Sequence, residues 1–234
     1  MADQLELRGV HAGYGRIGVL RDLDIRVPAG AVVALLGPNG AGKTTTLSAI
    51  AGTIPIARGD LLLQGRSIRR MSTYERARQG IVLVPEGRGV FPGLSVRENL
   101  ELVVRGSGCD RDTRAARMDE VLQVFPRLSE RLSQRAGTMS GGEQQMLALS
   151  RAFLTSPKVL LMDEISMGLA PQLVEDLFAA VQTLRSRGAT IVLVEQFLTY
   201  ALRFADVCYV LSKGRVSFVG EPSELRDGIE YLSA

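Results

Sequence analysis

Short stretches that mix apolar and polar positions between turn residues mark the first part of the chain. Residues 5–10 and 22–27 are of this kind, and residues 60–64 form another such stretch. Stretches of this length that are flanked by turns are typical of β-strands. We therefore expect a small antiparallel β region near the N-terminus.

From residue 31 onward the apolar runs become continuous. They cover residues 31–36, 81–84, 159–162 and 191–194, and helical stretches separate them. Continuous apolar runs are typical of strands that are buried on both faces, and intervening helices favour parallel pairing. The pattern predicts an α/β fold with a parallel sheet as its core.

The segment between residues 86 and 141 lacks strand-like runs, and its periodicity is helical. Ser95 and Glu98 have the spacing of a capping box, which marks a helix start. A second helical stretch covers residues 114–124 and ends before Pro126. After Gly214 the chain returns to a strand-like stretch, RVSFVG, and a short helix.

These patterns predict one domain over residues 1–234. Its core consists of residues 1–86 and 142–234 together with the antiparallel β region. Residues 87–141, approximately, form a helical lobe inserted into that core. We find no internal repeat and no low-complexity linker.

Composition narrows the classes of function. The chain has 234 residues, of which 46% are hydrophobic and 23% charged, as in ordinary globular proteins. Its net charge is only +3, and no basic run is interleaved with aromatic residues, so we expect no nucleic-acid partner. The apolar runs are far shorter than the ~20 residues of a membrane span. The N-terminus lacks a basic region followed by an apolar one, so we expect a cytoplasmic location.

The chain has two cysteines, Cys109 and Cys208. They have neither metal-ligand spacing nor the pattern of a disulfide framework. We expect both to be free thiols.

The sequence GPNGAGKTT follows the apolar run 31–36 and opens a helical stretch, the context in which a glycine-rich phosphate loop is meaningful. Backbone N–H groups of such a loop form a nest for phosphate oxygens at a helix N-terminus. Lys43 can reach the β- and γ-phosphates, and the Thr44 hydroxyl can ligate Mg²⁺. The alternative is a glycine-rich turn without a ligand. The predicted ATP-binding residues here are Gly37, Pro38, Asn39, Gly40, Ala41, Gly42, Lys43, Thr44 and Thr45.

Two carboxylates follow the buried run 159–162, at the strand end where open α/β sheets place their ligands. We interpret Asp163 as a residue that organises the Mg²⁺ shell and Glu164 as the catalytic base that orients or deprotonates the attacking water. The alternative is that both are solvated acids that cap the next helix.

Residues 138–153, TMSGGEQQMLALSRAF, offer a second set of backbone N–H groups at a helix N-terminus, which a single ATP does not need. With GPNGAGKTT and VLLMDE, this motif resembles the ATP-binding-cassette (ABC) ATPases over essentially the whole chain. The resemblance implies a P-loop NTPase (RecA-like) fold and one nucleotide-binding domain. It also implies a dimer that sandwiches two ATP molecules, in which Ser140, Gly141 and Gly142 act on the ATP of the other subunit.

The same resemblance gives two more assignments. Tyr14, in the loop between the first two strands, matches the aromatic residue that stacks on adenine, although a half-buried tyrosine at a strand end is an alternative. Residues 166–170 match the loop that contacts the other subunit across the dimer. Ile165 stands where a proline is common.

Two residues depart from the usual ABC pattern. Glu86 replaces a glutamine after the strand 81–84, and Gln196 replaces the switch histidine. The only histidine is His11, so we expect ATPase activity without a histidine-type pH step. Gln196 can still donate an amide N–H to the γ-phosphate. Glu86 would be repelled by phosphate, so we expect it to contact the metal or a water.

The stretches VPEGR (84–88), AGTMSGGEQQML (136–147) and LVEQ (193–196) resemble one ABC branch, the second ATPase of branched-chain amino acid importers. A branch that imports urea or short amides shares part of this pattern. Gly89 stands where the first branch often has arginine.

The resemblance implies an energy-coupling subunit on the cytoplasmic face of the inner or plasma membrane, held there by transmembrane permease subunits that contact residues 86–92. A second ATPase subunit, a sister protein or another copy of this chain, would be a direct partner, and a solute-binding protein an indirect one. An ATP-binding clamp with little hydrolysis is an alternative. A soluble ABC ATPase of DNA repair or translation would normally show a long coiled-coil insertion or tandem cassettes, and this sequence has neither.

Overall fold

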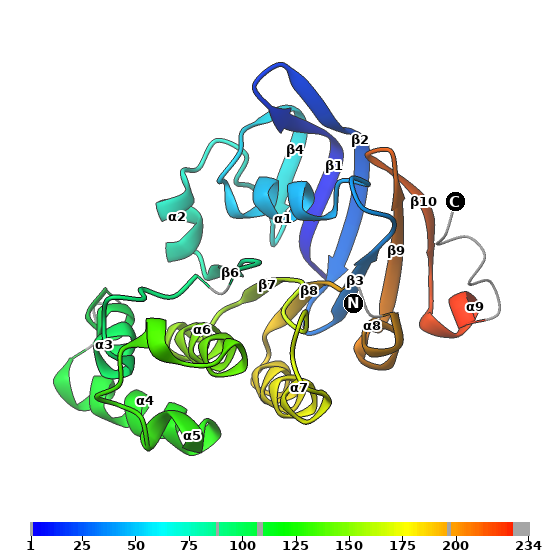
Figure 1. Ribbon diagram of the computed structural model, residues 1–234. Helices are drawn as coiled ribbons and strands as arrows, with labels where there is room; N and C mark the ends of the chain where they lie inside the picture. The colour runs from blue at the N-terminus through cyan, green and yellow to red at the C-terminus, as the bar shows by residue number, and fades with distance from the viewer. Residues whose placement is uncertain (1, 88, 107–109, 196–197, 227–234) are drawn as a thin grey trace.

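The computed structural model describes residues 2–87, 89–106, 110–195 and 198–226. Its strands form two sheets, one antiparallel and one mostly parallel (Figure 1). This arrangement confirms the predicted α/β fold with a separate antiparallel β region.

The antiparallel sheet has four strands in the order β2-β1-β4-β5. Their bounds are β1 Asp3–Tyr14, β2 Ile17–Pro28, β4 Ile56–Leu63 and β5 Arg66–Ser67. The first two strands are longer than predicted because the pairing of β1 with β2 continues through register shifts. Tyr14 is the last residue of β1 and lies opposite Ile17, so the prediction that it lies in a loop was wrong.

The second sheet has six strands in the order β10-β9-β3-β8-β7-β6. Five are parallel, and β10 joins one edge as an antiparallel hairpin partner of β9. The central strands β3, β7 and β8 are buried along their whole length, which explains their continuous apolar sequences. The bounds are β3 Val32–Leu36, β6 Ile81–Val84, β7 Val159–Asp163, β8 Thr190–Val194, β9 Val207–Ser212 and β10 Arg215–Gly220.

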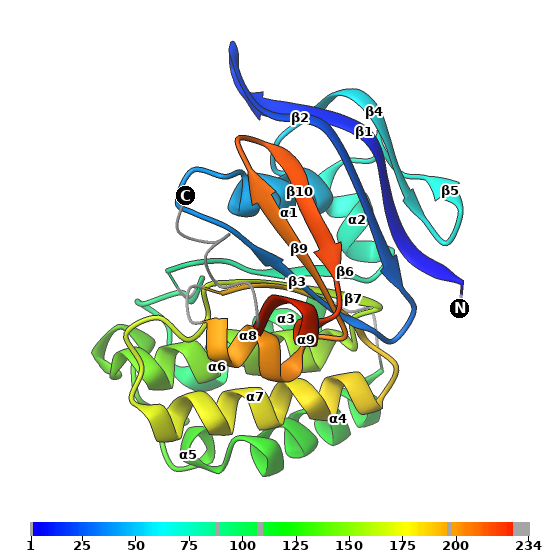
Figure 2. The same ribbon diagram turned by 90° about the vertical axis from the view of Figure 1, so that its right-hand side faces the viewer.

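Helices cover both faces of the parallel sheet (Figures 1 and 2). Helix α1 lies between the two sheets, and α6 and α7 pack on the opposite face, with α3 to α5 beyond α6. The bounds are α1 Lys43–Ala51, α2 Thr73–Arg78, α3 Val96–Gly106, α4 Arg111–Val124, α5 Pro126–Ser129, α6 Gly141–Thr155, α7 Pro171–Ser186, α8 Leu198–Phe204 and α9 Pro222–Arg226. None of the described helices is long and apolar enough to cross a membrane.

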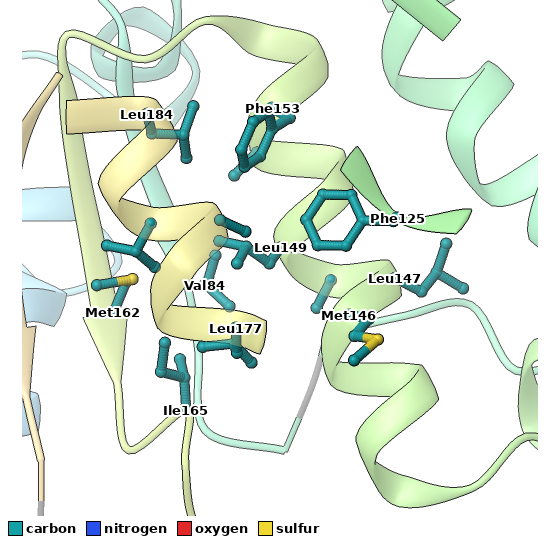
Figure 3. Close-up of a cluster of buried hydrophobic side chains, with 14 of the residues drawn as sticks. Val84, Phe125, Met146, Leu147, Leu149, Phe153, Met162, Ile165, Leu177 and Leu184 are labelled. Carbon is teal, nitrogen blue, oxygen red and sulfur yellow. The ribbon is translucent and has the colours of Figure 1, made fainter. Parts of the chain in front are cut away.

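Alternate side chains of β6, β7 and β8 enter two different cores, while β3 and β9 also contribute to a third cluster with α8. Val192 and Val194 of β8 face α1 and the antiparallel sheet, whereas Ile191 and Leu193 face the helices of the other side. Figure 3 shows part of this second core, which includes Phe153 of α6, Leu177 of α7 and Met162 of β7. The end of β7 is therefore held between two apolar layers.

The predicted capping box is present. The backbone N–H of Ser95 donates to Glu98 at 2.7 Å, and the backbone N–H of Glu98 donates to the Ser95 hydroxyl oxygen at 3.2 Å. The next long helix, α4, begins at Arg111 rather than residue 114, because Asp110 accepts a hydrogen bond from the N–H of Thr113 and caps it. The division of the chain into a core and an inserted helical lobe stays a prediction.

One tyrosine links the two sheets. The hydroxyl of Tyr209, on β9, accepts from the backbone N–H of Arg26 at 3.1 Å and donates to the Arg26 carbonyl at 3.2 Å. Arg26 belongs to β2. A single buried side chain thus satisfies two backbone groups of the neighbouring sheet.

Candidate nucleotide site

The segment from Gly37 to Gly42 leads from β3 directly into α1. Gly37 has a φ of 134°, and a Cβ atom there would lie 2.2 Å from the Leu211 carbonyl oxygen, so only glycine fits. Gly42 is the N-cap of α1 and offers no side-chain hydrogen bond to the first turn. The first backbone N–H groups of the helix therefore keep their capacity to bind an anion.

Lys43 lies inside this loop. Its Nζ donates to the carbonyl oxygens of Gly37 at 2.8 Å and Pro38 at 3.1 Å, and the residue is only 8% exposed. Burial lowers the pKa of Lys43, and the carboxylates of Glu164 and Asp163 oppose that change. The Lys43 ammonium thus lies at the centre of the loop, where it can bind the oxygens of a polyphosphate.

A turn from the far end of the chain supports the loop. The backbone N–H of Gly214 donates to the Ala41 carbonyl at 3.0 Å, and the Gly214 carbonyl accepts from the N–H of Arg21 at 2.9 Å. A Cβ atom at Gly214 would lie 1.8 Å from the Val19 carbonyl oxygen. Sequence reasoning missed this contact, although the pair Lys213-Gly214 between two strand-like stretches is a turn signal.

Asp163 ends β7 beside the first turn of α1. Its Oδ1 accepts a hydrogen bond from the Thr44 hydroxyl at 3.2 Å, and the residue is 3% exposed. The pKa of Asp163 is raised to about 6, chiefly by burial and in part by the carboxylates of Glu164 and Glu86, and the Thr44 hydrogen bond and the charge of Lys43 partly offset the increase. A cation at this position would therefore relieve an unfavourable concentration of negative charge.

Glu164 follows in a left-handed backbone conformation, with a φ of 48°. Its backbone N–H donates to the Val194 carbonyl of β8 at 2.9 Å. A cavity of about 490 Å³ lies between this residue and the phosphate loop, and Glu86 and Met167 also line it. The structure thus brings Lys43, Thr44, Glu86 and Glu164 to one cavity, although they come from different parts of the chain.

The metal-binding side chains at this site suit Mg²⁺ better than they suit a metal that the protein alone would ligate. Among the residues that the structure describes, three or more His, Cys, Asp or Glu side chains do not gather anywhere to form a metal cluster. The Thr44 hydroxyl and the Asp163 carboxylate lie together, and Mg²⁺ typically takes one or two carboxylates plus phosphate and water oxygens. These residues therefore suit a metal that arrives with a nucleotide.

The Ser-Gly-Gly motif lies at the start of α6. Ser140 is the N-cap, and its hydroxyl oxygen accepts from the N–H of Glu143, whose carboxylate accepts from the N–H of Ser140 at 2.9 Å. A Cβ at Gly142 would lie 2.4 Å from Leu173 of α7, so the helix packs closely there. Neither described cavity at the phosphate loop is lined by residues 140–142 or by Tyr14, which is 50% exposed.

Several predicted residues remain to be placed. Gln196 and Cys109 lie outside the described residues. His11 is in β1, where it pairs with Arg58 of β4. Cys208 is buried and free, as predicted, and burial raises the pKa of its thiol to about 11.

Glu195 is a polar residue that sequence reasoning passed over. It is 3% exposed, and it lines a second cavity of about 250 Å³ together with Gly37, Lys43 and Glu164. The motif LVEQ includes it, but a lone acid after an apolar run does not indicate which residue it contacts.

Known proteins of one family are similar to this chain in sequence and fold. The family model described as ABC transporter matches residues 20–166. The high-affinity branched-chain amino acid transport ATP-binding protein BraG of Pseudomonas aeruginosa is 46% identical over 203 residues, which cover 87% of this chain and 86% of BraG. The lipopolysaccharide export system ATP-binding protein LptB of Acidithiobacillus ferridurans is 32% identical over 227 residues, which cover 97% of this chain and 94% of LptB. A solved structure of the ATP-binding subunit of an ABC transporter has a TM-score of 0.86 at 30% identity, covering 99% of this chain and 95% of that one.

Proposed function

Because this chain belongs to the ABC transporter family and is an ATPase, we propose that it couples ATP hydrolysis to the import of a solute, with branched-chain amino acids as the substrate class. One observation carries the hydrolysis part of the proposal: Lys43, Thr44, Glu86 and Glu164 line one cavity at the start of α1, and Asp163 is bonded to Thr44 beside it. The direction of transport and the substrate class are proposed from the 46% identity with BraG.

Each residue has a distinct proposed role. Backbone N–H groups of residues 39–45 and the Nζ of Lys43 bind the β- and γ-phosphates. To do so, Lys43 gives up its hydrogen bonds to the Gly37 and Pro38 carbonyls. Thr44 and Asp163 hold Mg²⁺, which when bound neutralises charge on the phosphates, and Glu86 contacts the same ion or one of its waters. Glu164 orients and deprotonates the attacking water.

The position of the Ser-Gly-Gly motif supports a shared site. We assign Ser140, Gly141 and Gly142 to the γ-phosphate held by a second ATPase subunit, as their motif's resemblance to that of ABC ATPases implies; they do not line the two cavities described at this chain's own phosphate loop. Ser140 would then transfer its hydroxyl hydrogen bond from Glu143 to that phosphate. Tyr14, exposed at the end of β1, is the proposed stacking partner of adenine.

Membrane permease subunits are the expected partners of an ATPase of this family, and we propose that they contact residues 86–92. Phe91 is exposed there, and the Arg151 guanidinium of α6 lies 4.9 Å from the centre of its ring. Arg151 also donates to the Gly89 carbonyl. A movement of this loop would therefore be transmitted through Arg151 to α6, the helix that Ser140 caps. Bound to the permease subunits, the chain would lie at the cytoplasmic face of the membrane.

The test is Glu164→Gln in the purified full chain, with Glu101→Gln as a matched control; Glu101 lies on α3, where it is half-buried and pairs with Arg105. Glu164→Gln should abolish turnover and accumulate an ATP-bound dimer, measured by phosphate release and light scattering. Glu101→Gln should match the wild type. If the wild type shows little turnover and Glu164→Gln does not differ from it, the chain is an ATP-binding clamp; if both turn over equally fast, Glu164 is not the catalytic base.

Two further measurements test the finer assignments. Glu86→Gln should change the Mg²⁺ dependence of turnover, and an unchanged Mg²⁺ dependence would remove Glu86 from the metal's surroundings. In cells, loss of the chain should abolish uptake of leucine, isoleucine and valine. Loss of urea uptake instead would assign the importer to another solute.

A further inference from the structure

Glu195 is a buried carboxylate to which the proposed chemistry gives no role. It directly follows β8, and it is 3% exposed. Carboxylates are rarely buried to this extent without strong hydrogen-bond partners. The partners of Glu195 therefore indicate what it does.

Both carboxylate oxygens of Glu195 accept hydrogen bonds from the same residue, Ser166. The backbone N–H of Ser166 donates to Oε1 at 3.2 Å, and its hydroxyl donates to Oε2. Ser166 is fully buried, in the loop that follows the end of β7 and includes Glu164. Two bonds to one carboxylate fix the orientation of Ser166 as well as its position.

Val194, the residue before Glu195, makes a second contact with the loop that follows β7. The Val194 carbonyl accepts from the N–H of Glu164 at 2.9 Å, while the Glu164 carbonyl accepts from the N–H of Met167 at 3.3 Å. Glu164 has a positive φ of 48°, a conformation that a non-glycine residue keeps only when its surroundings impose it. Val194 and Glu195, at the end of β8, thus bind Glu164 and Ser166, which follow β7.

Ile165, between the two held residues, is anchored on the opposite side. Its side chain is buried in the helix-covered core, where Figure 3 shows it near Met162 and Leu177. The next residue but one, Met167, is 46% exposed. The loop therefore has an apolar anchor at Ile165 and a polar anchor at Ser166, and beyond them it turns toward solvent.

We propose that Glu195 is a positioning residue for ATP hydrolysis. It holds Ser166, and through Ser166 it keeps the backbone of Glu164 in the conformation that presents the Glu164 carboxylate to the phosphate-loop cavity. The inference rests on the proposed role of Glu164 as the catalytic base. It predicts that loss of the hydrogen bonds between Glu195 and Ser166 slows the chemical step and leaves ATP binding at Lys43 unchanged.

The experiment uses the purified full chain with Glu195→Gln, Ser166→Ala and the double variant. Glu195→Gln keeps the shape of the side chain but turns an N–H group toward one of the two donors of Ser166. We expect kcat to fall by about ten- to a hundred-fold, as for other small misplacements of catalytic groups. The Kd for ATP should stay within about two-fold, and the double variant should be no slower than the slower single variant, because both remove the same contact.

Two controls separate the possible outcomes. Tyr209→Phe also removes a buried hydrogen-bonding group, the bridge to Arg26, and should lower the melting temperature without lowering kcat. If Glu195→Gln behaves like Tyr209→Phe, its role is only structural and the inference is overturned. If Glu164→Gln keeps full turnover, the proposed function fails as well; if Glu164→Gln is inactive and Glu195→Gln is not, only this inference fails.

Discussion

Gly214→Ala tests whether the turn between β9 and β10 holds the phosphate loop in place. Gly214 has a φ of 80°, and an added Cβ would lie 1.8 Å from the Val19 carbonyl oxygen, which belongs to backbone and cannot rotate away. The turn must therefore retreat from β2. That movement would stretch the hydrogen bonds that Gly214 makes with Ala41 at 3.0 Å and Arg21 at 2.9 Å.

Gly65→Ala is the matched control. Gln64 and Gly65 have φ values of 51° and 75°, close to the 50° and 80° of Lys213 and Gly214, so the two turns have similar backbone conformations. A Cβ at Gly65 meets no atom within 4 Å. Both substitutions therefore carry the same backbone penalty of about 1–2 kcal/mol. Only Gly214→Ala also breaks two hydrogen bonds, at about 1 kcal/mol each.

The assay is urea unfolding together with equilibrium ATP binding. Gly214→Ala should lower the free energy of unfolding by about 2 kcal/mol more than Gly65→Ala, the sum of the two lost hydrogen bonds. It should also weaken ATP binding, since the carbonyl of Ala41 loses its partner, whereas Gly65→Ala should bind ATP as the wild type does. Equal unfolding curves and equal ATP affinities for the two variants would refute the reasoning.

Three other predictions follow from the site and its support. The pKa of Asp163 is raised to about 6, chiefly by burial, and Mg²⁺ binds only the ionised carboxylate. The affinity for Mg²⁺ at fixed ATP should therefore fall about tenfold per pH unit below that pKa and be constant above it. Equal Mg²⁺ affinities below and above that pKa would contradict this prediction. With saturating Mg²⁺, turnover should show no histidine-type step near pH ~6.5, and a step that persists in His11→Ala would be contrary to expectation. Arg76→Leu should lower the free energy of unfolding by about 2–4 kcal/mol, because buried Arg76 donates to the last carbonyls of α1, whereas the exposed-residue control Arg70→Leu should cost less than about 0.5 kcal/mol.

The parallel core could be predicted because its strands are buried on both faces. The runs at β3, β7 and β8 are apolar without interruption, so neither register nor partner had to be known to recognise them. The two-residue strand β5 gave no such signal, since two residues carry no periodicity. The length of β1 was underestimated, because its pairing with β2 continues past Val10 through register shifts that the sequence does not indicate.

At the site, too, residues in local motifs could be predicted from the sequence, whereas contacts between distant residues could not. The placement of Lys43, Thr44, Asp163 and Glu164 around the start of α1 could be predicted, because each stands at a fixed spacing from a strand end. The contact between Glu195 and Ser166 could not, because it depends on which strand lies beside β7 in the sheet. Gly214 was missed for the same reason, since its partner Ala41 is distant in sequence.

The position of β3 in the sheet has a consequence for synthesis of the chain. Although β3 is the third strand to be made, it pairs with β8 on one side and β9 on the other, and the turn that supports its loop follows β9. A nascent chain on the ribosome thus carries the complete sequence GPNGAGKTT long before it can hold a nucleotide there. Chains that terminate early would leave both edges of β3 unpaired, which makes them candidates for aggregation and proteolysis.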